Sequence, residues 1–141
     1  MPETSVLVPG VLTWHPHHVA SRAEIQTRLA AGQQMLLAAP ALVETYSVLT
    51  RLPPPRRLAA HRVVELMAAN YLDHGTVVAM DPGEYPAFFR LLASTHVAGG
   101  RAYDAVIAAT SRSAGAAVLL TFNARHFVGL IDDLDVVVPS A

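Results

Sequence analysis

The chain has 141 residues, of which 52% are hydrophobic and 15% are charged, and its formal net charge is −1. It has no cysteine, and because it also has no lysine, all ten basic residues are arginine. These absences exclude disulfides, zinc–thiolate and iron–sulfur sites, thiol nucleophiles, Schiff-base lysines and the phosphate-binding P-loop. Any chemistry must therefore use carboxylates, histidines, hydroxyls or arginines.

The length is typical of one domain, which we expect to span residues 1–141. The near-neutral charge argues against a strongly basic nucleic-acid binder but leaves room for a local phosphate-binding groove. No stretch approaches the roughly 18 apolar residues of a membrane span, and the N-terminus lacks the basic region of a signal peptide. We therefore expect a cytoplasmic protein that has no membrane partner.

Short apolar runs alternate with longer helical segments. The runs are typical of strands covered on both faces and comprise residues 35–38, 76–80, 117–121 and 135–138. The expected helices comprise residues 17–31, 41–52, 55–72, 82–96 and 101–114, and C-terminal caps are expected at Gly32, Gly75 and Gly115. The alternation predicts an α/β fold with a mainly parallel central sheet flanked by helices. In such a fold the active crevice lies at the carboxyl ends of the strands.

Acid or amide side chains occur where this crevice is expected. They are Glu3 before the apolar run 6–8, Glu44 on the helix after strand 35–38, Asp104 near the start of helix 101–114, and Asn123 just after Thr121. Each has an ordinary structural explanation, because acids in a first turn complement the helix dipole and strand ends often form Asx turns. Their convergence on one sheet edge favours a functional explanation. Clustered carboxylates repel one another unless a divalent cation such as Mg²⁺ or Mn²⁺ neutralises them.

Four stretches of the sequence also carry a family resemblance. They are residues 3–8 (ETSVLV), 40–53 (PALVETYSVLTRLP), 101–108 (RAYDAVIA) and 119–127 (LLTFNARHF). In this order they resemble PIN-domain ribonucleases, specifically the VapC-type toxins of type II (VapBC) toxin–antitoxin modules. The middle two stretches are long and specific, and the resemblance as a whole covers nearly the entire chain. The resemblance implies a PIN-like three-layer sandwich.

The resemblance also implies the roles of the candidate residues. Glu3, Glu44 and Asp104 take the places of the first three family acids and would hold one or two Mg²⁺ or Mn²⁺ ions for hydrolysis of an RNA phosphodiester bond. Asn123 falls at the fourth position and would orient a water or a phosphate oxygen. Ser5 and Thr121 match supporting positions, with Ser5 as the small hydroxyl that follows the first acid.

Glu3 departs from the family pattern. The first family acid is an aspartate that follows several apolar residues of a central strand, whereas Glu3 follows only Met1 and Pro2. Glutamate adds a methylene, and Mg²⁺ tolerates little deviation from octahedral geometry. Two explanations stay open: the true start lies upstream, or this copy has a weakened metal site. Of these we favour an altered site that still binds metal.

The basic side chains have less specific interpretations. Arg101 and Arg125 are candidates for phosphate contacts because they lie near the expected crevice. A denser group surrounds the triple proline 53–55 and comprises Arg51, Arg56, Arg57 and Arg62, which we expect to be a solvated helix start. His15, His17 and His18 lack metal-ligand spacing and are expected to be loop and helix-entry residues, and His126 is a weak candidate for a general base.

The leading hypothesis is therefore a metal-dependent endoribonuclease toxin, neutralised by a VapB-like antitoxin and assembled as a homodimer, as the resemblance implies. The alternative is a PIN-fold module that binds antitoxin or RNA without efficient cleavage because of Glu3. A metal-dependent phosphatase on another α/β fold lacks a nucleophilic aspartate motif in this sequence.

Overall fold

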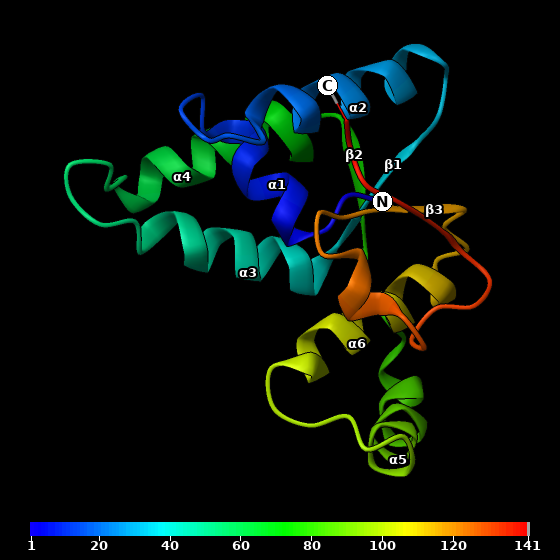
Figure 1. Cartoon of the computed structure of the whole chain (residues 1–141). Helices are drawn as coiled ribbons and strands as arrows, with labels where there is room; N and C mark the ends of the chain where they lie inside the picture. Colours follow the sequence, from blue (N-terminus) through cyan, green and yellow to red (C-terminus); the bar gives the residue numbers. More distant parts are fainter. Residues whose placement is uncertain (141) are drawn as a thin grey trace.

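The computed structural model describes residues 1–140, in which helices alternate with short strands (Figure 1). The strands are β1 (Met35–Ala38), β2 (Gly75–Val78), β3 (Val118–Leu120) and β4 (Asp135–Val137). The α-helices are α1 (Thr4–Val11), α2 (His18–Ala30), α3 (Ala39–Thr50), α4 (Ala60–Met67), α5 (Tyr85–Ser94) and α6 (Arg101–Ser113). Shorter helical turns are the π-helix Ala68–Leu72 and the 3₁₀-helices Pro82–Glu84 and Ala124–Phe127.

All strand pairs are parallel, which confirms the expected mainly parallel arrangement. β1 pairs with β2, and β3 pairs with β4. The first three residues run parallel to β3 on the edge opposite β4, because Leu120 N–H donates to the Met1 carbonyl at 2.8 Å and Glu3 N–H donates to the Leu120 carbonyl at 3.0 Å. The sheet is thus divided into two ladders, and residues 1–3 form a stub of a strand rather than a full one.

Helices cover these ladders and complete the core. α1 packs against α2 and α3, α3 also contacts α4 and α6, and α5 packs on α6. The side chains of Leu7, Leu37, Leu49 and Leu119 are fully buried where these elements meet. β1 leads directly into α3, and β3 leads into the turn at Asn123. The segments that follow the carboxyl ends of these two strands therefore lie at the predicted crevice.

The helix expected at residues 55–72 begins later than predicted, whereas its predicted end at Leu72 is confirmed. Its first residues form a turn, in which Arg56 N–H donates to the Pro53 carbonyl at 3.0 Å, and α4 begins only at Ala60. At its far end α4 passes into a π-helical turn, because the backbone after Met67 bonds five residues back instead of four.

The expected cap at Gly75 was also wrong, whereas Gly32 and Gly115 follow helix ends with φ of 79° and 66°, as C-terminal caps do. Gly75 is the first residue of β2. A Cβ there would lie 2.8 Å from Leu37 Cδ1 and 3.0 Å from the Met35 carbonyl oxygen. The glycine is therefore needed for the close approach of β1 and β2.

A second close approach joins α1 to the π-helical turn. The Tyr71 ring is buried, and its hydroxyl donates to the Leu7 carbonyl at 2.6 Å. A Cβ on Gly10 would lie 2.3 Å from that hydroxyl oxygen. Glycine thus lets α1, which carries Glu3 at its cap, pack closely against this turn.

No helix within residues 1–140 is long and apolar enough to cross a bilayer.

Candidate active site

Glu3 caps the first helix from the end of the N-terminal stub. Its Oε2 accepts from the Ser5 backbone N–H at 3.0 Å, which satisfies a free donor of the first turn of α1, and its Oε1 is hydrogen-bonded to Ser5 Oγ. Only 3% of the residue is exposed. Burial raises the pKa of the Glu3 carboxyl, an effect that the hydrogen bonds from Ser5 and Thr121 oppose and that the nearby Glu44 charge reinforces.

The hydroxyls of Ser5 and Thr121 join the start of α1 to the turn that follows β3. Phe122 N–H donates to Ser5 Oγ at 2.8 Å, and Asn123 N–H donates to Thr121 Oγ1 at 2.8 Å. The two hydroxyl oxygens lie 3.4 Å apart. The structure therefore gives both predicted supporting residues a position beside Glu3. Asn123 itself is exposed, and within residues 1–140 its side-chain amide has no hydrogen-bond partner.

Glu44 enters the site from the second turn of α3. It is exposed, and its Oε2 accepts a hydrogen bond of 2.7 Å from Thr4 Oγ1. Thr4 is buried at the first position of α1, directly after Glu3. The first turn of α1 thus forms hydrogen bonds to two acids: Ser5 bonds to Glu3, and Thr4 bonds to Glu44.

Asp104 enters from the first turn of α6. Its Oδ2 lies 3.6 Å from His126 Nδ1, on the 3₁₀-helix after Asn123. Partial burial raises the pKa of Asp104, the positive charge of His126 opposes this, and the Glu44 charge raises the pKa further.

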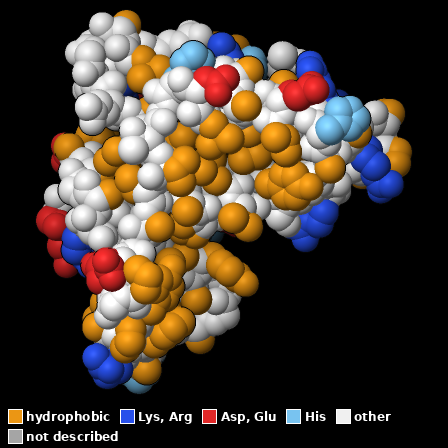
Figure 2. Space-filling view, turned by 180° about the vertical axis from the view of Figure 1, so that it is seen from behind, with side chains coloured by type: hydrophobic (Ala, Val, Ile, Leu, Met, Phe, Trp, Pro, Cys, Tyr) orange, Lys and Arg blue, Asp and Glu red, His pale blue; other side chains and the backbone are white. Residues whose placement is uncertain are grey.

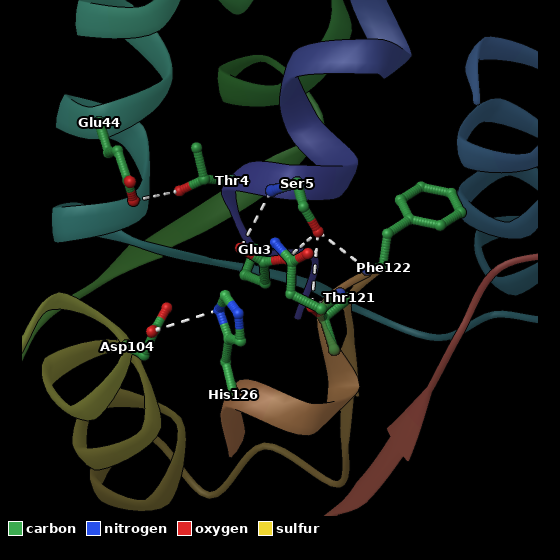
Figure 3. A network of polar contacts seen from close by, with 9 residues as sticks. Glu3, Thr4, Ser5, Glu44, Asp104, Thr121, Phe122 and His126 are labelled. Carbon is green, nitrogen blue, oxygen red and sulfur yellow. Dashed lines mark hydrogen bonds and ion pairs between the residues drawn. The ribbon is translucent and has the colours of Figure 1, made fainter. Parts of the chain in front are cut away.

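The three acids surround one space at the carboxyl ends of the strands (Figure 3). The negative charge of Glu44 raises the pKa of both Glu3 and Asp104, so the carboxylates repel one another across this space. Within residues 1–140, however, no three Asp, Glu or His side chains take an arrangement that could hold a metal ion. Glu3 is turned towards Ser5, and Asp104 is turned towards His126.

The predicted phosphate-contacting arginines lie at the rim of this space. Arg101 is exposed at the start of α6, and its charge slightly opposes the rise in the pKa of Asp104. Arg125 is exposed beside His126. Neither belongs to an ion pair within the described part of the chain.

Two partners in the site, Thr4 and His126, were not predicted from the sequence, in which Thr4 is only part of a matching stretch and His126 only a weak candidate for a base. The one available signal was position, since Thr4 follows Glu3 and His126 lies three residues after Asn123.

The N-terminal histidines lie apart from the acids. His18 Nδ1 lies 2.8 Å from the Pro9 carbonyl oxygen, and the His17 ring stacks on Phe122 with a centroid distance of 4.1 Å. A cavity of about 510 Å³ also lies elsewhere, at the amino ends of the strands, where Met1, Met35 and Val118 line it. None of the three acids, Glu3, Glu44 and Asp104, lines this cavity.

Comparison with known proteins bears on the family and the fold of the chain. Residues 1–129 match the PIN domain family. The chain is 42% identical over 122 residues to ribonuclease VapC40 of Mycobacterium tuberculosis, covering 84% of this chain and 82% of that protein. It is 36% identical over 106 residues to ribonuclease VapC27 of the same organism, covering 75% and 72%. The crystal structure of M. tuberculosis VapC20, described as a Sarcin-Ricin loop cleaving toxin, superposes with a TM-score of 0.67 at 16% identity, covering 94% of this chain and 96% of VapC20.

Proposed function

The chain belongs to the PIN-domain family, among its VapC-type ribonucleases, and from this premise we propose that it is a metal-dependent endoribonuclease toxin. The observation that carries the proposal is the convergence of Glu3, Glu44 and Asp104 on one space, from the N-terminus, α3 and α6. The reaction is hydrolysis of an RNA phosphodiester bond.

The donor set fits a divalent cation in its chemistry. Three carboxylates, the Asn123 amide and nearby hydroxyls supply only hard oxygen and amide groups, which Mg²⁺ and Mn²⁺ prefer, and the chain has no thiol to favour a softer metal. The mutual repulsion of the carboxylates is also what a bound cation would relieve. Glu3, Glu44 and Asp104 are the residues that would hold the ion. When bound, it supplies Lewis-acid stabilisation of phosphate charge and a more acidic water.

The remaining side chains have positioning and binding roles in this proposal. Asn123 orients a water or a phosphate oxygen without adding charge to the crowded acids. Arg101 and Arg125 contact phosphates, because a guanidinium is a permanently charged, bidentate donor. Ser5 and Thr121 fix the turn that carries Asn123 relative to Glu3.

We place the partners of this toxin on its exposed apolar helix surfaces. Val43 and Tyr46 on α3 and Val64 on α4 are exposed, as are Phe89 and Leu91 on α5. Figure 2 shows hydrophobic side chains gathered over the lower part of the molecule, where α5 lies, and across the face above it. A VapB-like antitoxin helix and a second copy of the chain are the proposed occupants of such faces. We propose the cytoplasm as the location of this activity, because the RNA substrate and the antitoxin would both be met there.

A second candidate has its own supporting observation. Both carboxylate oxygens of Glu3 are hydrogen-bonded to Ser5, and the acids in residues 1–140 do not form a metal-holding group. A module that binds RNA or antitoxin but cleaves inefficiently would have this arrangement.

One experiment separates the two candidates. The purified protein is incubated with end-labelled RNA in Mn²⁺, Mg²⁺ or EDTA, beside Glu44→Gln, Asp104→Asn and the exposed carboxylate control Asp73→Asn. We expect metal-dependent cleavage that the first two variants lower by about 100-fold or more, beyond the loss typical for outer partners of metal ligands. Asp73→Asn should cleave normally. Cleavage at the wild-type level by both site variants contradicts the acid assignment, whereas RNA binding without cleavage by the wild type supports the second candidate.

A further inference from the structure

A row of rings leads away from the candidate active site along the protein surface. The ring row consists of Trp14, His15, His17 and Phe122. Consecutive centroids lie 6.0 Å apart from Trp14 to His15, 5.6 Å from His15 to His17 and 4.1 Å from His17 to Phe122. The row therefore connects the segment between α1 and α2 to the turn after β3.

One end of the ring row is part of the site network. Phe122 follows Thr121, and its backbone N–H donates to Ser5 Oγ, which is bonded to Glu3. Figure 3 shows Phe122 on the side of Ser5 opposite Glu44. A polymer that crosses the acids would therefore meet the ring row next.

The other end of the ring row is positively charged. The Arg56 guanidinium carbon lies 3.8 Å from the Trp14 ring centroid. Arg51 and Arg57 occupy the same connection between α3 and α4, and none of the three arginines has a carboxylate partner within residues 1–140. Figure 2 shows basic side chains at the end of the molecule where this connection lies. The charge is thus free to meet an anion.

Two of the four rings of the ring row are exposed to solvent, whereas His15 is half-buried and Phe122 packs against the core. Trp14 is 41% exposed, and His17 is exposed. The planes of Trp14 and His15 are tilted by 43°, and those of His15 and His17 by 40°, so these neighbours do not cover each other's faces. Only His17 and Phe122, at 16°, form a closed stack. Flat ring faces beside arginines are the surface on which unpaired bases stack while their phosphates bind the cations.

We propose that the ring row, together with Arg56 and Arg57, binds unpaired nucleotides of an RNA strand that passes through the active site. The inference rests on the proposed ribonuclease function and adds a surface, outside the three acids, that binds the substrate strand. Arg56 covers one face of Trp14, so a base stacks on the other face of Trp14 or on His15. Such stacking selects unpaired bases, because paired bases in a duplex have their faces covered.

Trp14 is the only tryptophan, so its fluorescence reports on this surface directly. The Asp104→Asn variant, in which we expect RNA cleavage to be strongly lowered, is titrated in EDTA with an unstructured 12-nucleotide RNA and with the same sequence as a duplex. We expect the single strand to quench Trp14 fluorescence and the duplex to quench it at least about 5-fold more weakly. Equal quenching by both forms, or by inorganic polyphosphate, would show a surface that senses only charge and would overturn the proposal.

Variants of the ring row provide a second measurement. In the Asp104→Asn background, His17→Ala and Arg56→Ala should each weaken binding of labelled single strand by about 5-fold or more in fluorescence anisotropy, at constant salt. His17→Phe keeps a ring on Phe122 and should retain the affinity, which separates lost stacking from lost folding. The matched control is Arg90→Ala on α5, which should bind as the parent does. Unchanged affinity in both His17→Ala and Arg56→Ala overturns the proposal.

The outcomes for this surface and for the proposed activity are distinguishable. Single-strand binding with Trp14 quenching, but no cleavage by the wild-type chain, contradicts the nuclease and leaves the ring row as an RNA surface. Normal cleavage with no Trp14 quenching keeps the nuclease and removes the ring row from its substrate path.

Discussion

The hydroxyl of Thr4 donates a 2.7 Å hydrogen bond to Oε2 of Glu44, so that the first residue of α1 holds a carboxylate of α3. Thr4 is buried, whereas Glu44 is exposed and would otherwise sample several rotamers. The bond therefore restrains Glu44 on the side of α3 that faces Asp104 and Glu3.

Thr4→Val should lower RNA cleavage while it preserves the fold. Valine keeps the shape of the side chain but cannot donate to Glu44, and a hydrogen bond of about 1 kcal/mol corresponds to a loss of about 5-fold. Cleavage rates at saturating Mn²⁺ and urea unfolding measure the two effects. Thr50→Val is the control, since Thr50 Oγ1 bonds only within α3, to the Tyr46 and Ser47 carbonyls. Equal rates for Thr4→Val and the wild type would refute a positioning role for Thr4.

Glu3→Gln should stabilise the metal-free protein at neutral pH. Because burial raises the pKa of Glu3, the folded state binds more protons than the unfolded state, and stability is lost as pH rises from the ordinary range of a glutamate through the raised pKa. Glutamine has no charge to bury and can still accept from Ser5 N–H. Urea unfolding in EDTA measures this effect. Between pH 4.5 and pH 7.5 the free energy of unfolding should fall more for the wild type than for Glu3→Gln.

Added metal should reverse the order of stability, so that the wild type becomes more stable than Glu3→Gln. If Glu3 is a ligand, Mn²⁺ raises the free energy of unfolding of the wild type more than that of Glu3→Gln, because binding to the folded state alone stabilises it. An equal response of the two proteins to Mn²⁺ would assign Glu3 only to the cap of α1.

His126→Gln should move the acidic limb of the pH–rate profile to higher pH. The positive charge of His126 opposes the rise in the pKa of Asp104, so its removal leaves Asp104 protonated up to a higher pH. The loss of activity should consequently be greater at pH 6 than at pH 8. His126→Arg retains the charge and should keep the limb at or below its original position, and a profile unchanged in both variants would exclude His126 as an influence on Asp104.

Gly10→Ala should destabilise the fold by about 1–3 kcal/mol, the usual range for overpacking. The added Cβ would meet the Tyr71 hydroxyl at 2.3 Å, and that hydroxyl is held by the Leu7 carbonyl. Tyr71→Phe removes the obstructing oxygen, so the double variant should lose less stability than the sum of the single variants. Gly100→Ala, which meets nothing within 4 Å, is the control. Additive losses in the double variant would show that the clash is not the cause.

The sequence was sufficient to predict that α3, α6 and the turn after β3 meet at the site, because parallel strands share an edge at their carboxyl ends, but it did not predict the helix α1 that begins at Thr4. It also predicted β1 and the start of α6 with no error in their bounds. The start of the helix at 55–72 was mispredicted because a proline is acceptable at a helix start, and nothing local showed that the chain would turn at Arg56 instead.

Side-chain directions within the site could not be predicted in the same way. The bond from Thr4 to Glu44 joins residues 40 positions apart, and that from Phe122 to Ser5 joins residues 117 apart. Such contacts depend on the final packing of α1 against α3 and β3, which local propensity does not encode. The family pattern therefore located Glu3, whereas its engagement by Ser5 required the structure.

The network around Ser5 and Thr121 has a spectroscopic consequence. The backbone N–H groups of Ser5, Phe122 and Asn123 each donate to a side-chain oxygen of the site, namely those of Glu3, Ser5 and Thr121. Amide proton chemical shifts respond to the charge of the acceptor and to the length of the hydrogen bond. The amide resonances of Ser5, Phe122 and Asn123 should therefore shift together when a cation binds the Glu3 carboxylate. A diamagnetic ion such as Mg²⁺ could then be followed in solution without any RNA present.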